Sequence, residues 1–193
     1  MAKKSRVWDG TAWQELASAQ TDLTAYSTTA QMNTAIATGS KILQVVSTVN
    51  TATQSTTSTS FVDALTLSIT PTSASSKIFI SAFITGGSLP SATTIPFRLV
   101  RDSTGIFVGD SAGSRVQATG NIIPYSNTNF QSQANVTFLD SPATTSAITY
   151  KIQYKAEAGG SSTIYLGRSY ADGDATYSLR TPSAGIVLME VRG

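Results

Sequence analysis

The residues of this chain that could do chemistry are a few carboxylates, arginines and amides, because the sequence contains no cysteine and no histidine. Asp172 and Asp174 flank a glycine, and two carboxylates at that spacing could share a calcium ion. The same Asp-Gly-Asp sequence is typical of an ordinary turn, which is the interpretation we favour. We therefore expect neither a metal site nor a cofactor.

A second set of charged residues lies beside predicted turns and consists of Arg101, Asp110, Arg115 and Asp140. A glycan-cleaving enzyme would need two carboxyl groups about 5–10 Å apart, one of them with a raised pKa. Structural salt bridges explain the same residues and are the interpretation we favour. Without imidazole or thiolate, most common catalytic constellations are also absent. We therefore expect a protein that is not an enzyme.

The loop from Gly120 to Gln131 carries side chains suited to a sugar. The set comprises Tyr125, Asn127, Asn129 and Phe130. Aromatic rings can stack on the face of a sugar, while amides form hydrogen bonds with its hydroxyl groups. This pattern predicts a candidate receptor loop for a cell-surface glycan. The solubility of an ordinary surface loop would explain the same residues.

The composition excludes several classes of partner. Serine and threonine make up roughly three residues in ten and charged residues only 12%, against about 25% in an average soluble protein. The net charge is +2, and the one basic cluster, Lys3, Lys4 and Arg6, is too short for a nucleic-acid surface. No run approaches the 18 or so apolar residues of a membrane span, and no signal peptide is recognisable. We expect synthesis in the cytoplasm without membrane insertion.

The N-terminal elements that would position these residues begin with a turn between two tryptophans. Val7, Trp8 and Trp13 surround the turn dipeptide Asp9-Gly10, which predicts a small hairpin. Two indoles on a segment without its own core would expose a large apolar area. We therefore predict that residues 1–20 dock into another protein. A tryptophan cluster packed on its own chain is the alternative.

Residues 21–40 predict a short helical stalk that follows Asp22 and stops at Gly39. A helix of about ten residues is marginal alone in water, so its apolar side chains need a packing partner. In a homo-oligomer the nearest partner is the same helix of a neighbouring copy. The predicted contact residues are Leu23, Tyr26, Ala30, Met32 and Ile36.

From Lys41 the hydrophobic period changes from 3.6 to 2 residues. Strands are predicted at residues 41–49, 65–69, 76–85, 96–101, 106–110, 133–139, 148–155, 162–168 and 185–192. Roughly eight to ten strands without a helical period predict an antiparallel β-sandwich, jelly-roll-like, as a head over residues 41–193. The hydroxyl-rich tract from Thr51 to Ser60 is predicted to be a connection or an edge strand.

Three predicted strands are apolar on both faces. They contain residues 42–46, 78–84 and 186–191. A strand of a sandwich usually buries one face and wets the other. The excess predicts a second buried surface, and a subunit interface around a symmetry axis would supply it.

Together these segments resemble the fibre proteins of tailed bacteriophages, particularly phages of marine bacteria and cyanobacteria. The resemblance at the N-terminus lies in Trp8-Asp9-Gly10 with Trp13 and in residues 22–29 through Ala35-Ile36. In the head it is carried by Lys41-Ile42-Leu43-Gln44-Val45-Val46, Arg101-Asp102, Gly109-Asp110, Ser114-Arg115, Leu139-Asp140-Ser141-Pro142, Thr144-Thr145, Tyr150-Lys151 and Met189-Glu190.

The resemblance implies a homotrimeric structural protein, made in the host cytoplasm and located in the virion. It would be a short fibre that docks by its N-terminus to a tail, neck or capsid protein. Its β head would then contact the host surface, with a host glycan as a further partner. The alternative is a capsid decoration or cement protein with a purely structural role.

Overall fold

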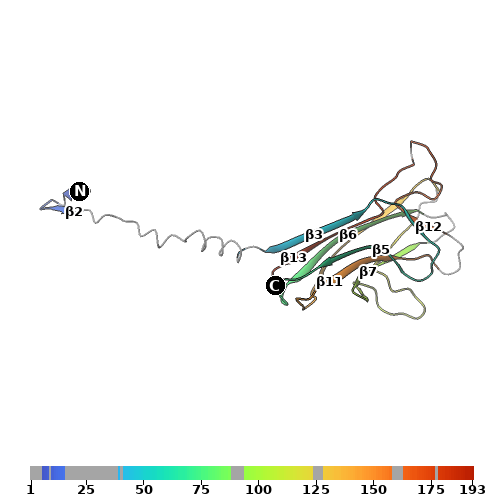
Figure 1. Ribbon diagram of the computed structural model, residues 1–193, viewed down its shortest axis with the longest axis horizontal. Coiled ribbons are helices and arrows are strands. Elements are labelled where there is room, and N and C mark those ends of the chain that lie inside the picture. The colour runs from blue at the N-terminus through green and yellow to red at the C-terminus, as the bar shows by residue number, and fades with distance from the viewer. Residues whose placement is uncertain are drawn as a thin grey trace. The chain divides into compact units, whose positions relative to one another are not determined.

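The structure is a computed structural model that describes residues 6–8, 10–15, 39, 41–87, 94–123, 128–157, 163–176 and 178–193. The chain divides into two compact units, Met1–Ser40 and Lys41–Gly193. The described residues are mainly β, as the sequence predicted (Figure 1). A search of the same residues for a helix of the length and apolarity needed to cross a membrane finds none.

The first unit contains a hairpin of β1 (Arg6–Trp8) and β2 (Trp13–Glu15). The strands of the second unit are β3 (Ile42–Asn50), β4 (Gln54–Thr56), β5 (Val62–Ile69), β6 (Lys77–Gly87), β7 (Ile95–Arg101), β8 (Thr104–Ile106), β9 (Gly120–Ile122), β10 (Ser132–Asp140), β11 (Ile148–Tyr154), β12 (Ile164–Leu166) and β13 (Ala184–Val191).

Two antiparallel sheets lie face to face in the second unit (Figure 1). The first sheet has the order β3-β13-β6-β10, and the short strands β4 and β12 prolong it alongside β6. The second has the order β5-β11-β7, with β8 and β9 sharing the far edge of β7. We number the strands of this unit from one to eight in chain order, leaving out β4 and β12 and counting β8 and β9 as one strand. The first sheet then has the order 1-8-3-6, and the second has the order 2-7-4-5. This is the strand order of a jelly roll.

The central strand β6 shows how the sequence selects this arrangement. Ile78, Ile80 and Ile84 alternate with Phe79 and Phe83, so the two sets point to opposite faces of the sheet. The isoleucines are fully buried in the core between the sheets, and each such burial contributes roughly 1.5–3 kcal/mol relative to exposure. The two phenylalanines lie on the outer face of the first sheet and are half-buried.

The predicted strands agree with the structure to within two residues at most ends, but the run 106–110 is clearly wrong. The run 106–110 was predicted as a strand, but β8 ends at Ile106. Phe107 adopts a left-handed φ of 52°, and its ring stacks on Phe138 of β10 at 4.8 Å between centroids. This contact with a distant strand outweighs the local β propensity. In the tract 51–60, the described residues form only the short strand β4.

The sandwich has two ends that differ in their polar contacts. The base is the end where β3 begins and β13 ends, and the tip is the opposite end, near Asn50 and Ala184. At the base, Glu190 of β13 is fully buried. Its Oε1 accepts hydrogen bonds from the backbone N–H and the hydroxyl of Thr72, both at 2.7 Å, and its Oε2 accepts one from Gln44 Nε2 at 2.6 Å. The carboxylate therefore ties the connection between β5 and β6 to the first sheet.

These contacts make a prediction about stability in acid. Burial raises the pKa of Glu190, but the neighbouring hydroxyl of Ser76 and the hydrogen bonds from Gln44 and Thr72 outweigh it and hold that pKa at about 2, below its ordinary 4.5. The stabilisation is therefore complete above about pH 4.5 and is lost as the pH falls towards 2. We expect Glu190→Gln to lower the free energy of unfolding at pH 7 by about 1–3 kcal/mol.

Urea unfolding between pH 7 and pH 2 measures this effect. The variant should lack part of the acid-dependent loss of stability shown by the parent protein. Asp110→Asn is the matched control, because Asp110 is exposed and its replacement removes the same charge. Equal effects of the two substitutions would contradict the role assigned to Glu190.

Candidate functional site

The outer face of the first sheet carries a continuous apolar row. Val45, Met189, Phe79 and Leu139 are direct neighbours on four successive strands and all point away from the core. Val45 is 54% exposed and Leu139 is 47% exposed. We refer to these four residues as the apolar row. The two-sided pattern predicted from the sequence is therefore present in β3, β6 and β13.

A groove of about 430 Å³ lies beside the apolar row on the same face. Its lining includes Ser81, Val187, Val49 and Phe83. The ring of Phe83 lies on Gly185, where an added Cβ would come within 2.3 Å of the ring. Glycine is therefore required at position 185 for the phenylalanine to lie flat on the sheet.

The outer face of the second sheet has the opposite character. The Asp63 carboxylate accepts hydrogen bonds from Lys151 Nζ at 2.9 Å and from Gln153 Nε2 at 2.6 Å. Arg98 Nε donates to Gln153 Oε1 at 2.9 Å, and its guanidinium lies 4.2 Å from the centroid of the Phe61 ring. This face is polar, as expected of a sheet in contact with water. The apolar row on the outer face of the first sheet therefore needs a different explanation.

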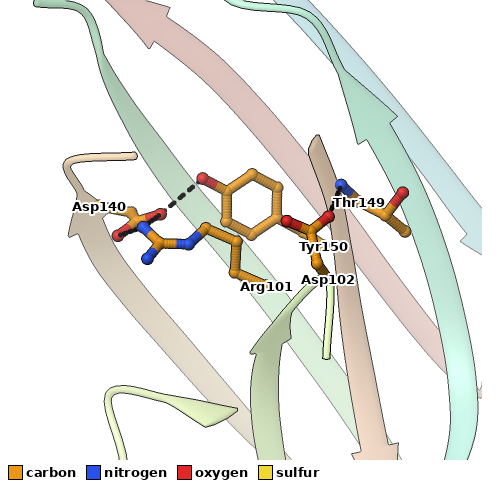
Figure 2. A network of polar contacts seen from close by, with 5 residues as sticks. All are labelled: Arg101, Asp102, Asp140, Thr149 and Tyr150. Carbon is orange, nitrogen blue, oxygen red and sulfur yellow. Dashed lines mark hydrogen bonds and ion pairs between the residues drawn. The ribbon is translucent and has the colours of Figure 1, made fainter. Parts of the chain in front are cut away.

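The two sheets are joined at the base by a network of polar contacts (Figure 2). The buried carboxylate of Asp140, at the end of β10, accepts hydrogen bonds from Arg101 Nη1 at 2.9 Å and from Tyr150 Oη at 2.7 Å. Burial and the adjacent Asp140 carboxylate raise the pKa of Tyr150, so the phenol stays protonated and donates. Beside it, the N–H of Thr149 donates to Asp102 Oδ1 at 3.0 Å.

Of the four charged residues that the sequence offered as candidates for a glycan-cleaving site, this network contains two, Arg101 and Asp140. Asp140 accepts hydrogen bonds from Arg101 and Tyr150, whereas Asp110 and Arg115 are exposed. Arg101 and Tyr150 belong to the second sheet and Asp140 to the first. The contacts therefore form a structural link between the sheets, in line with the salt bridge that the sequence favoured.

A polar pocket of about 290 Å³ opens at the tip, on the outer side of the first sheet. It is lined by Thr53, Gln54, Ser55, Tyr165, Arg168, Asp172 and Arg180, and we refer to it as the tip pocket. Asp172 Oδ2 lies 2.9 Å from Arg168 Nη1 and 2.5 Å from Arg180 Nη2. The Arg168 guanidinium also lies over the ring of Tyr165, 3.7 Å from its centroid.

In the tip pocket, Asp172 of the Asp-Gly-Asp sequence has partners that the sequence alone did not reveal. The Asp172 carboxylate is engaged by two guanidinium groups, while Asp174 is exposed. Within the described ranges, no group of three or more potential metal-ligating side chains comes together. Asp172 has a left-handed φ of 49°, which aspartate tolerates better than most residues. The carboxylate thus organises the arginines of the loop.

Only part of the predicted receptor loop is described. Tyr125 and Asn127 lie outside the described residues, whereas Asn129 and Phe130 are placed at the tip. There, Thr128 accepts a hydrogen bond from the N–H of Ala171 at 2.9 Å, beside the loop that carries Asp172. The first part of the predicted loop is not a loop, because residues 120–122 form β9.

The described part of the N-terminal unit contains the predicted hairpin. The hairpin is confirmed, with Val7 opposite Gln14 and Trp8 opposite Trp13, and Trp8 is 52% exposed. Gly39 has a helical backbone. The predicted stalk residues Leu23, Tyr26, Ala30, Met32 and Ile36 all lie outside the described residues.

Sequence reasoning missed the arginines and Tyr165 of the tip pocket. Arg168 and Tyr165 are three residues apart, but Arg180 follows twelve residues after Arg168 and Ser55 belongs to another strand. The signal that was available is the group of tyrosines and arginines between residues 165 and 180 in a chain with few charges. Comparison of the sequence with models of protein families and with curated proteins finds no match.

The link at the base predicts a large stability effect. Asp140→Asn removes the charge that pairs with Arg101 and weakens the acceptor for Tyr150 in a buried position. We expect a loss of about 3 kcal/mol in the free energy of unfolding, measured by urea titration at pH 7. Asp63→Asn breaks an ion pair on the polar outer face and should cost less than about 1 kcal/mol. Similar losses for both variants would argue against the structural link.

Proposed function

We propose that the protein is a virion structural protein of a tailed bacteriophage, a short homotrimeric fibre without enzymatic activity. In this proposal, residues 1–20 dock into another virion protein and residues 21–40 form the helical stalk. The β head over residues 41–193 contacts the host surface. The observation that carries the proposal is the apolar row on the outer face of the first sheet, because it favours self-association of the head.

Three features support a second copy of the chain as the cover of this face. The apolar row runs across all four main strands of the sheet, so the same row of a second copy matches it in width. Burying a valine, leucine, methionine or phenylalanine contributes roughly 1.5–3 kcal/mol relative to exposure. The stalk predicted immediately before the head also needs a partner of its own kind.

The assignment to a virion rests on the order of the segments and on the resemblance of the sequence to phage fibres. The confirmed hairpin presents Trp8 at a position 52% exposed, which suits docking into a pocket of another protein. The serine- and threonine-rich surface suits a protein displayed to solvent. The loops gathered at the tip supply a surface for host contact.

A charge placed on the apolar row tests the trimer. We expect Val45→Glu and Leu139→Glu, made separately, to give folded monomers, because burying an unpaired carboxylate costs several kcal/mol at each interface. Thr66→Glu is the control, since Thr66 is exposed on the outer face of the second sheet and lies opposite Lys151. Light scattering gives the oligomeric state and circular dichroism the fold.

A parent protein that is a stable monomer would contradict the proposal. The same conclusion would follow if both glutamate variants remained trimeric. Adsorption and mechanical stability of particles that lack the protein distinguish host contact from the alternative role in decoration. Fragile particles with unchanged adsorption would favour decoration.

The docking of the N-terminal segment is tested by Trp8→Ala combined with Trp13→Ala. Each indole seated in a partner's pocket contributes roughly 1.5–3 kcal/mol, so the double variant should dock more weakly by several kcal/mol. We expect a folded trimer that is absent from assembled particles, as judged by mass spectrometry of purified virions. Incorporation at the parental level would overturn the docking role of Trp8 and Trp13.

A further inference from the structure

The tip pocket has more hydrogen-bond donors than its own carboxylate can satisfy. Each guanidinium of Arg168 and Arg180 carries five N–H donors, whereas the Asp172 carboxylate offers about four acceptor sites. Both arginines contact the same oxygen, Asp172 Oδ2, through one Nη atom each. Two positive charges against one negative charge leave the pocket with a net charge of +1. The complement to such a pocket is an anionic group with several oxygens.

The two arginines differ in how they are held. The side chain of Arg168 is 19% exposed, and its guanidinium is fixed between Asp172 and the ring of Tyr165. Tyr170 packs against that ring in a T-shaped arrangement, with 5.7 Å between centroids. The side chain of Arg180 is 61% exposed and is held by Asp172 alone among these side chains. Arg180 is therefore the cation that is most accessible to a ligand.

The other side of the pocket is lined by hydroxyl groups. Ser55 pairs in register with Tyr165, so the strand β4 forms one wall, and Thr53 lies just before it. Hydroxyl groups can both donate and accept, as sugar hydroxyls also do. Accessible guanidinium groups beside hydroxyls suit a sugar that carries a negative charge.

From this geometry we propose that the tip pocket binds the acidic groups, carboxylate or sulfate, of a host-surface polysaccharide. This inference rests on the proposed function, because it names the ligand of the host-contacting head. The Arg180 guanidinium makes the primary ion pair with the acidic group. Arg168 supplies a second, fixed charge, and Thr53 and Ser55 bind neighbouring hydroxyls.

Binding of the intact protein to three immobilised polymers in 0.15 M NaCl tests the proposal. Polygalacturonate supplies carboxylates, dextran sulfate supplies sulfates, and dextran is the neutral reference. We expect binding to at least one acidic polymer and none to dextran. The acidic polymer that binds more tightly identifies the recognised group as carboxylate or sulfate. Arg180→Ala should weaken that binding at least tenfold. Arg115→Ala is the matched control, because it removes the same charge from an exposed position outside the pocket.

A second pair of variants changes the charge in the opposite direction. Asp172→Asn removes the internal competitor for the arginines, and asparagine tolerates the left-handed φ at this position. It should bind the acidic polymer several-fold more tightly than Asp110→Asn, which alters the net charge equally. Thermal melting of both variants confirms that they are folded.

Three outcomes would overturn the inference. The first is that the parent protein binds neither acidic polymer, and the second is that Arg115→Ala weakens binding as much as Arg180→Ala. The third is that folded Asp172→Asn binds no more tightly than Asp110→Asn. Oligomeric state and incorporation into particles are measured on the same preparations. A trimer that enters particles but fails these binding tests would refute the ligand class and leave the proposed fibre intact.

Discussion

The need to bury both faces of the central strand β6 governs the rest of this structure. Its isoleucines require the second sheet as a cover, which closes the sandwich. Of its outward phenylalanines, Phe79 lies between Leu139 and Met189, and Phe83 lies between Asn135 and Gly185. Within a single head nothing described covers that second face, whereas the outer face of the other sheet is polar. The same alternation that folds the head thus provides the surface through which we propose it associates.

Two buried carboxylates then give the ends of the sandwich different roles. Asp140 and Glu190 are the neighbours of Ile78 on its two sides, and each is held by hydrogen bonds at the base. These contacts fix the connections at the base to the sheets. The tip carries instead Arg180, whose side chain is 61% exposed. Buried carboxylates hold the base, whereas the buried polar residues of the tip, such as Thr85 and Ser183, are uncharged.

Prediction from the sequence worked where one residue type and a short period were sufficient. The alternation of β6, β10 and β13 gave their positions to within two residues, because every second side chain must enter the core. Prediction failed at Phe107, whose left-handed backbone depends on stacking with Phe138 thirty-one residues later. It also missed the tip pocket. Ser55 and Arg180 line the same pocket only because β4 pairs with β12 and the chain after β12 comes back to that strand pair.

By itself the sequence determined that the chain is mainly β, that a hairpin with two tryptophans precedes the head, and that several strands are apolar on both faces. Those properties are local, since they depend on turn residues and on the alternation of neighbouring side chains. The tertiary structure alone decided which sheet carries the apolar row, and that Asp172 binds arginines rather than standing in an isolated turn. The reason is that strand order brings together residues far apart in the chain, and no local pattern records that order.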